Sequence, residues 1–324
     1  MFIKVLSTLV VSSLCFSAGS VVAQSAANYP NKPIKFVVSF TAGGTTDILA
    51  REVAQQMTVR WKVPVIVENK PGASGNLGTE MVGKSPADGY TILVNSFGPI
   101  TINPTLFKSL PVIPQRDLQP VALLADVPTV LVVPSSIGVN TFKEFEAYAK
   151  SRGDKINYGS TGIGTAAHMT GFLFSKQAKL GATHIPYKGA EATRDLVAGR
   201  LDYMFATVPS VVPLIKGGQL KPLAVSTKGR SRALPDLPTL QELGVDMATG
   251  SWFGMFVPKN TPPDIVKKLN ETVVSILEEP QLKQRLVAQG AEPIPMNVAE
   301  FTKFLKADYD TWTPVVKESG AKAE

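Results

Sequence analysis

Two turns in the sequence combine glycines with short hydroxyl side chains. The first covers residues 41–46 (Thr-Ala-Gly-Gly-Thr-Thr) and the second covers residues 160–165 (Ser-Thr-Gly-Ile-Gly-Thr). Each turn follows an apolar run and precedes a helical pattern, so backbone N–H groups at a helix start lie beside hydroxyls. These groups can hold an anionic oxygen without a full opposite charge. Two such turns, one in each of two lobes, favour lobes that close on a carboxylate. The alternative is that Thr45 or Thr46 and Thr165 only cap their helices.

Two other glycine patterns match nucleotide-binding motifs in spacing but not in context. Residues 78–85 fit a phosphate-binding loop, yet the pattern ends an expected helix and Pro86 follows at once, so the amides would point away from a phosphate. Residues 162–167 fit the looser dinucleotide fingerprint between a strand and a helix. The acidic residue expected about twenty positions later is missing, because the first carboxylate is Glu191. We therefore expect no nucleotide cofactor.

Side chains that usually carry metal or nucleophilic chemistry are sparse. The chain has two histidines, His168 and His184, and a single cysteine, Cys15. A zinc site would need carboxylates for most of its ligands, so structural roles for the histidines are favoured. Ser74 and Ser160 lie near glycines, but neither has the Gly-x-Ser-x-Gly pattern of hydrolases. We expect no bound metal and no catalytic serine.

The composition is that of an ordinary globular protein. Hydrophobic residues make up 44% of the 324 residues, charged residues 18% and aromatic residues 8%, which argues against disorder and coiled coils. The formal net charge is +7, but the lysines and arginines are dispersed, which favours weak attraction of anions over a nucleic-acid interface. Only the N-terminus is apolar over nearly the length of a membrane span, so an integral transporter or channel is excluded.

The N-terminus is typical of a secretory signal peptide, residues 1–23. Lys4 supplies the positive start, residues 5–16 form the apolar region, and small residues end at Ala23. A retained membrane anchor is the alternative, but no cluster of stop-transfer charges follows. Cleavage after Ala23 would remove Cys15 and predicts an exported, soluble protein without disulfides.

Strands and helices alternate along the rest of the chain. Apolar runs at 34–40, 63–68 and 90–94 predict strands, and helical patterns follow the first two. The order of strand, glycine turn and helix recurs after residue 156, which predicts α/β layers with a largely parallel sheet. Thr141 and Glu144 form a capping box at the start of another expected helix.

The domain organisation follows from two expected crossings of the chain. Residues 125–128 separate two β-rich runs and indicate a strand that leaves one sheet and enters another. We expect the chain to return with the strand at 223–225. The expected lobes are therefore 24–125 together with 226–324, and 126–225 as an inserted lobe.

Motifs spread along the mature sequence resemble the Bug family, the TctC-like solute receptors of tripartite tricarboxylate transporters. They lie at 29–34 (Tyr-Pro-Asn-Lys-Pro-Ile), at 40–44 with Asp47 and Arg51, at 67–75, 88–91, 158–160 with His168, 186–189 and 234–239, and at Trp252. The resemblance covers nearly all of the mature chain. It implies a type II periplasmic-binding-protein fold, in which two α/β lobes are joined by two crossing strands and both turns hold a ligand carboxylate, partly through bound water.

The resemblance also implies where the ligand lies. Carried over by position, the contacts are Thr41, Ala42, Gly43, Gly44, Thr45, Thr46 and Asp47 in the first turn, and Ser160, Thr161, Gly162, Gly164, Thr165 and His168 in the second. A distal pocket near Asn95, Ser96, Ala206 and Thr207 would set specificity. Family members that take amino acids tend to place an acidic residue at 205–207, and its absence here favours a carboxylate without an ammonium group.

The implied function is a non-catalytic periplasmic receptor. It would capture a small organic carboxylate and deliver it to the membrane permease subunits of a tripartite tricarboxylate transporter. We expect a monomer without a cofactor, a metal ion or a nucleic-acid partner. Two alternatives are a receptor that docks on a membrane histidine kinase and a secreted enzyme.

Overall fold

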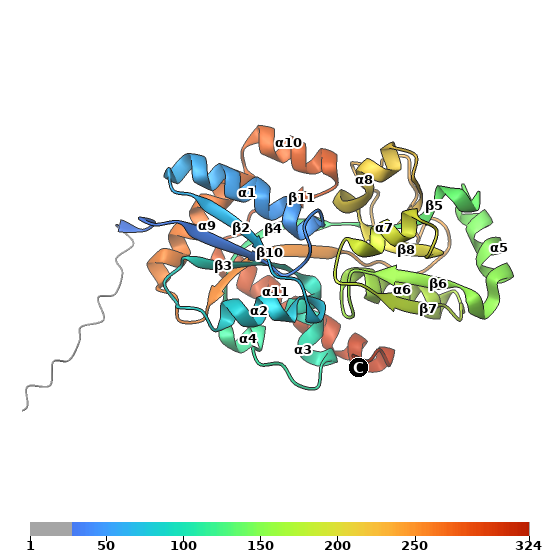
Figure 1. Cartoon of the computed structure of the whole chain (residues 1–324), viewed down its shortest axis with the longest axis horizontal. Coiled ribbons are helices and arrows are strands. Elements are labelled where there is room, and N and C mark those ends of the chain that lie inside the picture. The colour runs from blue at the N-terminus through green and yellow to red at the C-terminus, as the bar shows by residue number, and fades with distance from the viewer. Residues whose placement is uncertain (1–27, 324) are drawn as a thin grey trace, which may run out of the picture.

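The computed structural model describes residues 28–323 as two α/β lobes that lie side by side (Figure 1). The expected signal peptide, residues 1–23, lies outside the described residues. Each lobe is built on one β-sheet with a hydrophobic core on each of its faces. Within the described part of the chain, no helix combines the length and the apolar character needed to cross a membrane.

Lobe 1 contains a six-stranded sheet with the order β11-β4-β10-β3-β1-β2. Its strands are β1 (Ile34–Val38), β2 (Val65–Asn69), β3 (Thr91–Ser96), β4 (Leu118–Val127), β10 (Ser251–Pro258) and β11 (Glu292–Pro293). Phe36 and Val38 of β1 belong to one core and Val37 to the other. This alternation is that of a strand buried on both faces of its sheet.

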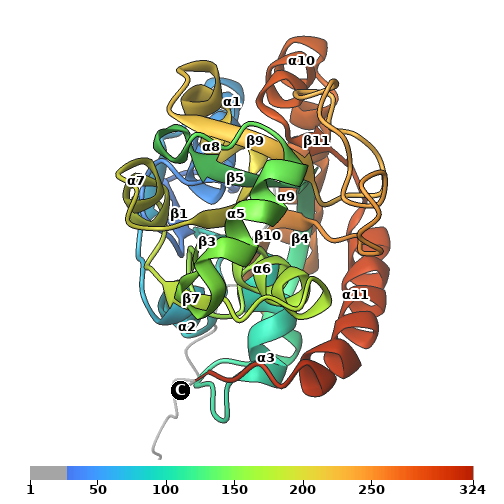
Figure 2. The ribbon, with the colours of Figure 1, turned by 90° about the vertical axis from the view of Figure 1, so that its right-hand side faces the viewer.

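Helices cover both faces of this sheet. One face carries α1 (Thr45–Trp61), α9 (Pro263–Leu277) and α10 (Pro280–Gln289); the other carries α2 (Asn76–Gly83), the π-helical segment η3 (Gly98–Ile102), α3 (Asn103–Leu106) and α11 (Val298–Ser319). Two short helices, η2 (Ala73–Gly75) and α4 (Pro114–Asp117), lie between longer elements. Figure 2 shows α11 along the outside of lobe 1. The helical spacing of Ile265, Leu269 and Val273 buries one stripe of α9.

Lobe 2 contains a five-stranded sheet with the order β7-β6-β8-β5-β9. Its strands are β5 (Thr129–Pro134), β6 (Asn157–Ser160), β7 (Thr183–Pro186), β8 (Tyr203–Thr207) and β9 (Leu220–Val225), and its helices are η4 (Ser135–Ile137), α5 (Phe142–Arg152), η5 (Gly153–Lys155), α6 (Ala166–Gln177), α7 (Glu191–Val197) and α8 (Val208–Lys216). The predicted capping box of Thr141 and Glu144 is present at the start of α5. The sequence pattern does not predict α8, because Pro213 lies inside it.

The sheets are mixed, so the expectation of a largely parallel sheet is wrong. β1 pairs in parallel with β2 and β3, and β6 with β7 and β8. In contrast, β10 is antiparallel to β3 and β4, and β5 is antiparallel to β8 and β9. β5 follows β4 of lobe 1, and β10 is the next strand in the chain after β9 of lobe 2. Both β5 and β10 start at the junction of the lobes, where β1, β3, β6 and β8 end, and therefore run in the opposite direction.

The pairing of β9 favours a second crossing that lies later in the chain than residues 223–225. β9 does not leave lobe 2, because it pairs with β5. After β9, Thr239 forms a bridge with Val225, and Leu240 and Met247 are buried in the core of lobe 2. We therefore propose that residues 226–250 belong to lobe 2 and that the chain returns to lobe 1 with β10. This segment forms no long helix or strand, so no periodicity indicates the lobe on which it packs.

Candidate functional site

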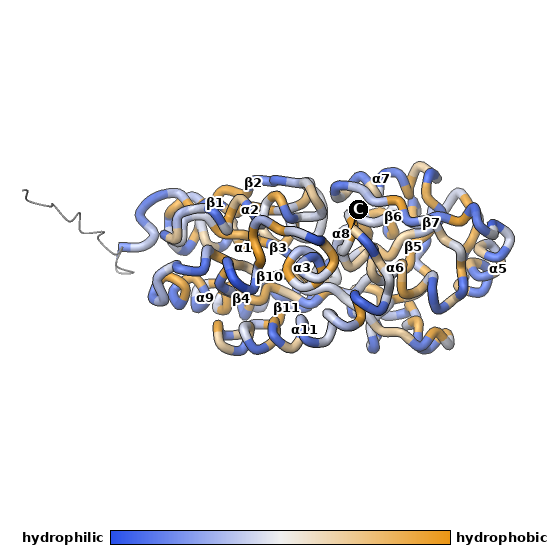
Figure 3. Tube along the Cα trace, turned by 90° about the horizontal axis from the view of Figure 1, so that it is seen from below, coloured by the Kyte–Doolittle hydropathy of each residue, from blue (hydrophilic) through white to orange (hydrophobic). Residues whose placement is uncertain are grey.

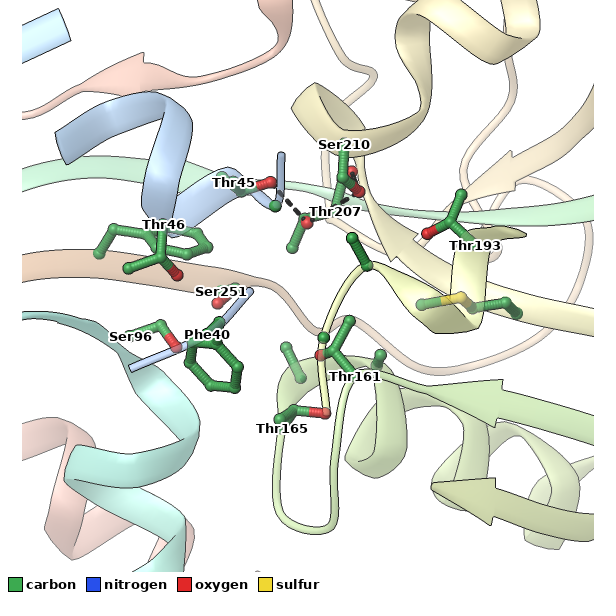
Figure 4. A pocket seen from close by; sticks show the side chains of 17 residues that line it. Phe40, Thr45, Thr46, Ser96, Thr161, Thr165, Thr193, Thr207, Ser210 and Ser251 are labelled. Atoms are coloured by element: carbon green, nitrogen blue, oxygen red, sulfur yellow. Dashed lines mark hydrogen bonds between the residues drawn. The ribbon is translucent and has the colours of Figure 1, made fainter. Parts of the chain in front are cut away.

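A cavity lies between the lobes, where β1 and β3 of lobe 1 and β6 and β8 of lobe 2 end (Figure 4). Its volume is about 50 Å³, and a water molecule needs about 10 to 15 Å³ of such space. The lining residues are Phe40, Gly44, Thr45, Thr46, Ser96, Thr161, Thr165, Ala166, Ala167, Gly189, Ala190, Thr193, Met204, Thr207, Ser210, Ser251 and Phe253. Ligands of α/β proteins bind at the carboxyl ends of strands and between domains, and this cavity suits a small solute.

Three helices of at least eight residues begin at this cavity. Gly44, Thr165 and Thr207 are the N-cap residues of α1, α6 and α8, and all three line the cavity. A helix N-terminus carries partial positive charge and N–H groups without intrahelical partners. Three such ends at one cavity favour an anionic ligand.

Hydroxyl groups line much of the remaining surface. Figure 4 shows Thr46, Ser96 and Ser251 together on the lobe 1 side, with Thr161 and Thr165 of lobe 2 facing them. None of the described residues that line the cavity has a charged side chain. Among residues 28–323, no group of three or more His, Cys, Asp or Glu is arranged to hold a metal ion. The cavity can therefore hold an anion through amide and hydroxyl dipoles.

Asp47 supports the turn of lobe 1 from behind. Its carboxylate accepts hydrogen bonds from Gly43 N–H, Arg51 Nε and Asn69 Nδ2, each at 3.0 Å. Burial raises the pKa of Asp47, but the hydrogen bonds from Arg51, Gly43 and Asn69 outweigh burial and hold this pKa below its ordinary value. Gly43 has a φ of +85°, which favours glycine at this position. Asp47 is therefore charged and fixes the shape of the turn.

The first turn of α1 has no side-chain cap. Gly44 is its N-cap residue and cannot supply one, and Thr45 and Thr46 already lie inside the helix. The N–H groups at this helix start therefore remain available to a ligand. Ala42 and Gly43 do not line the cavity but border a neighbouring surface pocket.

The turn of lobe 2 is hydrogen-bonded within itself. Ser160 Oγ lies 3.0 Å from the Gly162 carbonyl oxygen and accepts from Gly162 N–H at 3.2 Å. Thr165 Oγ1 donates to the same carbonyl oxygen at 2.7 Å and accepts from His168 N–H at 3.4 Å, so Thr165 caps α6. Thr161 and Thr165 line the cavity, whereas Ser160, Gly162, Gly164 and His168, although expected as contacts, do not.

Two more expected residues, Asn95 and Ala206, also lie away from the cavity. The Asn95 side chain is fully buried and donates to Ser39 Oγ at 3.1 Å and Thr79 Oγ1 at 2.9 Å. Ala206 packs in the core of lobe 2. Each precedes a lining residue, Ser96 or Thr207, by one position. Neighbouring side chains on a strand point to opposite faces, so only one of each pair reaches the cavity.

The lobes touch each other around the cavity. Thr45 Oγ1 of lobe 1 lies 2.7 Å from Thr207 Oγ1 of lobe 2, and Ala190 N–H donates to Thr41 Oγ1 at 2.9 Å. A Cβ atom on Gly164 would lie 2.2 Å from Asn103 Oδ1 in α3, which Figure 3 shows at the junction of the lobes. Thr41 thus joins the lobes without lining the cavity. The structure has the two lobes closed on each other.

Ten lining residues are not among those that the sequence predicts. They are Phe40, Ala166, Ala167, Gly189, Ala190, Thr193, Met204, Ser210, Ser251 and Phe253. Phe40 and Gly189 lie inside motifs of the family resemblance, and Ala166 and Ala167 directly follow the second turn. The sequence therefore contains a signal for these four as ligand contacts. Ser251 and Phe253 lie on β10, one on each side of Trp252, and only the pairing of β10 with β3 brings them to the cavity.

Comparison with known proteins identifies the family. Residues 49–321 match the tripartite tricarboxylate transporter family receptor, TctC. The chain is 33% identical to Protein BugT of Bordetella pertussis, with 97% of each chain covered. An R. palustris protein solved with adipate is 34% identical, with a TM-score of 0.88 over 91% of this chain and 99% of that chain. MatC from Rhodopseudomonas palustris, solved with bound malate, is 30% identical, with a TM-score of 0.84 over 89% of this chain and 100% of that chain.

These matches confirm the resemblance that the motifs indicate. They extend over nearly the whole of this chain and of its relatives, and they include the two-lobed α/β fold. The chain therefore belongs to the family of tripartite tricarboxylate transporter receptors, which includes the Bug proteins.

Proposed function

We propose that this chain is a periplasmic receptor that binds a small organic carboxylate between its lobes and delivers it to the permease subunits of a tripartite tricarboxylate transporter. The observation that carries this proposal is a cavity without charged lining residues at which three helices begin. The relatives solved with adipate and with malate support a carboxylate ligand.

Hydrogen bonding can compensate the desolvation of a carboxylate in this cavity. An anion leaves water only where donors replace its hydration shell. The uncapped start of α1 and the hydroxyls of Thr46, Ser96 and Ser251 supply such donors on the lobe 1 side. Hydrogen bonds to charged groups contribute about 1.5 to 3 kcal/mol each, and micromolar binding needs about 8 kcal/mol net, so a few such bonds suffice.

The lining favours a carboxylate without an ammonium group. An ammonium ion buried in the cavity would need an acceptor of opposite charge. None of the described lining residues is acidic, and residues 205–207 are Phe, Ala and Thr. The preferred ligands are therefore mono- or dicarboxylates, and amino acids are disfavoured.

The same lining supports a receptor over an enzyme. General acid–base chemistry needs a titratable group within reach of the substrate. The described lining residues include no Asp, Glu, His, Lys, Cys or Tyr. We therefore propose a non-catalytic, monomeric receptor whose ligand leaves unchanged, exported through the signal peptide at 1–23. Intact mass of the exported protein tests this cleavage, and gene deletion followed by uptake of labelled ligand tests delivery to the permease.

Titration calorimetry with adipate, malate and adipamide tests the carboxylate site. We expect adipate or malate to bind, and adipamide to bind at least about tenfold more weakly because it lacks the charge, a difference of about 1.4 kcal/mol. Thr46→Val should weaken dicarboxylate binding, whereas Thr302→Ala, an exposed change on α11, should leave it unchanged. Equal affinity for adipate and adipamide, or no effect of Thr46→Val, would place the ligand elsewhere.

A further inference from the structure

Two stacked histidines lie behind the turn of lobe 2. His168 in α6 and His184 in β7 have ring centroids 4.1 Å apart with 24° between the ring planes. Tyr158 of β6 stacks on the other face of this group, 4.9 Å from His184. His168 is 5% exposed, and neither histidine lines the cavity. The pair is therefore placed to act on the turn and not directly on a ligand.

Each imidazole is hydrogen-bonded to one part of the turn. His168 Nδ1 accepts from Gly164 N–H at 3.0 Å, so this nitrogen carries no proton. His184 Nε2 lies 2.7 Å from Ser160 Oγ, which is itself bonded to Gly162. Both ends of the turn are thus held by hydrogen bonds to side chains from outside it.

The part of the turn held by His168 also meets lobe 1. A Cβ atom on Gly98 of lobe 1 would lie 2.8 Å from the Gly164 carbonyl oxygen. On either side of this contact, Thr161 and Thr165 line the cavity. A displacement of Gly164 would therefore change both the lining of the cavity and the fit of the closed lobes.

We propose that His168, packed on His184, is a positioning residue for ligand capture, whose neutral imidazole fixes Gly164 and thereby the cavity-lining threonines of the turn. The inference rests on the proposed function, because the affinity that it controls is that for a carboxylate. Protonation of Nδ1 would replace the acceptor with a donor facing Gly164 N–H, and the bond would be lost.

The surroundings of the pair keep it neutral. Burial lowers the pKa of His168 to about 4. Burial, followed by the charge of His168, lowers the pKa of His184 to about 3. The titratable rings that stack against the pair are Tyr158 and, beyond it, Tyr203. Among the described residues, no carboxylate contributes to either lowered pKa.

Two substitutions that differ in one acceptor test the proposal. His168→Asn keeps an acceptor near the position of Nδ1, whereas His168→Leu keeps the apolar bulk and removes the acceptor. By calorimetry with adipate at pH 7, we expect His168→Leu to bind about tenfold more weakly, and His168→Asn to stay within about threefold of the unsubstituted protein. Equal affinity of both variants would overturn the proposal.

The pH profile separates positioning from simple packing. Between pH 7 and pH 3.5, the unsubstituted protein should lose about fourfold more adipate affinity than His168→Asn, the factor expected for one group that titrates near pH 4. Protonation of the ligand affects both proteins equally and cancels. Parallel pH profiles would contradict the proposal, and this comparison remains valid if His168→Leu does not fold.

Amide hydrogen exchange of the ligand-free protein gives an answer that does not depend on the ligand. Gly164 N–H should exchange faster in His168→Leu, and His168→Asn should restore its protection. If the unsubstituted protein binds neither adipate nor malate, the proposed function fails, and Gly164 exchange still decides whether His168 holds the turn. Unchanged Gly164 exchange in His168→Leu would refute the positioning role.

Discussion

The two turns that meet the cavity from opposite lobes satisfy their backbone groups in different ways. In lobe 1, α1 starts at Gly44 and has no side-chain cap. In lobe 2, Thr165 caps α6, and its hydroxyl also donates to the Gly162 carbonyl oxygen. The first turn therefore offers N–H groups to a ligand, whereas the second uses its polar groups within the protein.

This difference separates affinity from stability. N–H groups without a partner gain hydrogen bonds only when an anion enters, so changes in the first turn should act mainly on binding. A hydroxyl that is already paired stabilises the free protein, so removing the capping hydroxyl of Thr165 from the second turn should act mainly on folding. Simple helix capping therefore describes the hydroxyl of Thr165 but not Thr45 or Thr46, which lie inside α1.

Gly44→Val should have the largest effect on binding. A Cβ atom at this position would lie 3.6 Å from the Thr41 carbonyl oxygen, which is an ordinary contact, and its φ of −80° is open to any residue. The valine methyl groups would enter the space where the ligand approaches α1. We expect adipate affinity to fall about 100-fold or more by calorimetry. Full affinity with an undisturbed melting temperature would show that the start of α1 does not hold the ligand.

The pH dependence of the free energy of unfolding should show whether a neutral His168 supports the second turn. His168 has a pKa of about 4 in the folded protein and an ordinary value of 6.5. Between pH 6.5 and pH 4, His168 is therefore protonated in the unfolded chain but neutral in the folded chain. The contribution of neutral His168 to stability is fully present above pH 6.5. It decreases as the pH falls and is constant below pH 4. Between these limits the unsubstituted protein should lose on the order of 3 kcal/mol more than His168→Asn.

Urea unfolding at several pH values measures this difference. The carboxylates titrate in both proteins and cancel in the comparison. Identical pH profiles of the free energy of unfolding would mean that His168 is not kept neutral by the fold.

Asp47→Ala should show how strongly the first turn depends on its support. The substitution removes the acceptor of Gly43 N–H, Arg51 Nε and Asn69 Nδ2. We expect a loss of about 2 kcal/mol in the free energy of unfolding together with weaker adipate binding. Asp47→Asn, which keeps one acceptor oxygen, should lose less of both. A stable Asp47→Ala variant with full affinity would show that the turn keeps its shape without this carboxylate.

A pair of threonine substitutions should give the smallest effects and compare the turns directly. Thr165→Ala removes the cap of α6 and should cost about 1 kcal/mol of stability. Thr46→Ala removes a cavity hydroxyl that caps no helix, so it should weaken adipate binding a few-fold without lowering stability. Melting temperatures and calorimetry on both variants test this, and the opposite pattern would reverse the assignment of the two turns.

Much of the local structure could be predicted from the sequence. The strand–turn–helix units around residues 41–47 and 160–165, the capping box of α5 and the apolar stripe of α9 all lie where the pattern predicts them. The direction of β5 and β10 and the packing of residues 226–250 could not be predicted. These features depend on which distant strand pairs with which, and the residues themselves carry no sign of it.

The residues of the candidate site also divide into those that could be predicted from the sequence and those that could not. Gly44, Thr46 and Ser96 line the cavity as expected, because turns at the ends of strands converge between lobes. Asn95 and Ala206 were expected on the cavity side, but each points to the opposite face from its neighbour. A shift of one residue changes the face, and side-chain type alone does not set it.

Residue types a few positions apart determined the two glycine turns, most helix starts and the family motifs, because hydrogen bonds and helix dipoles at a turn act over a few ångströms along the chain. The tertiary structure alone decided that Ser251 and Phe253 join the cavity, that Ser160 in the turn of lobe 2 contacts His184, and that Thr41 and Thr207 meet the opposite lobe. Most of these contacts join residues that are more than a hundred positions apart. Only the pairing of strands and the closure of the two lobes bring such residues within reach.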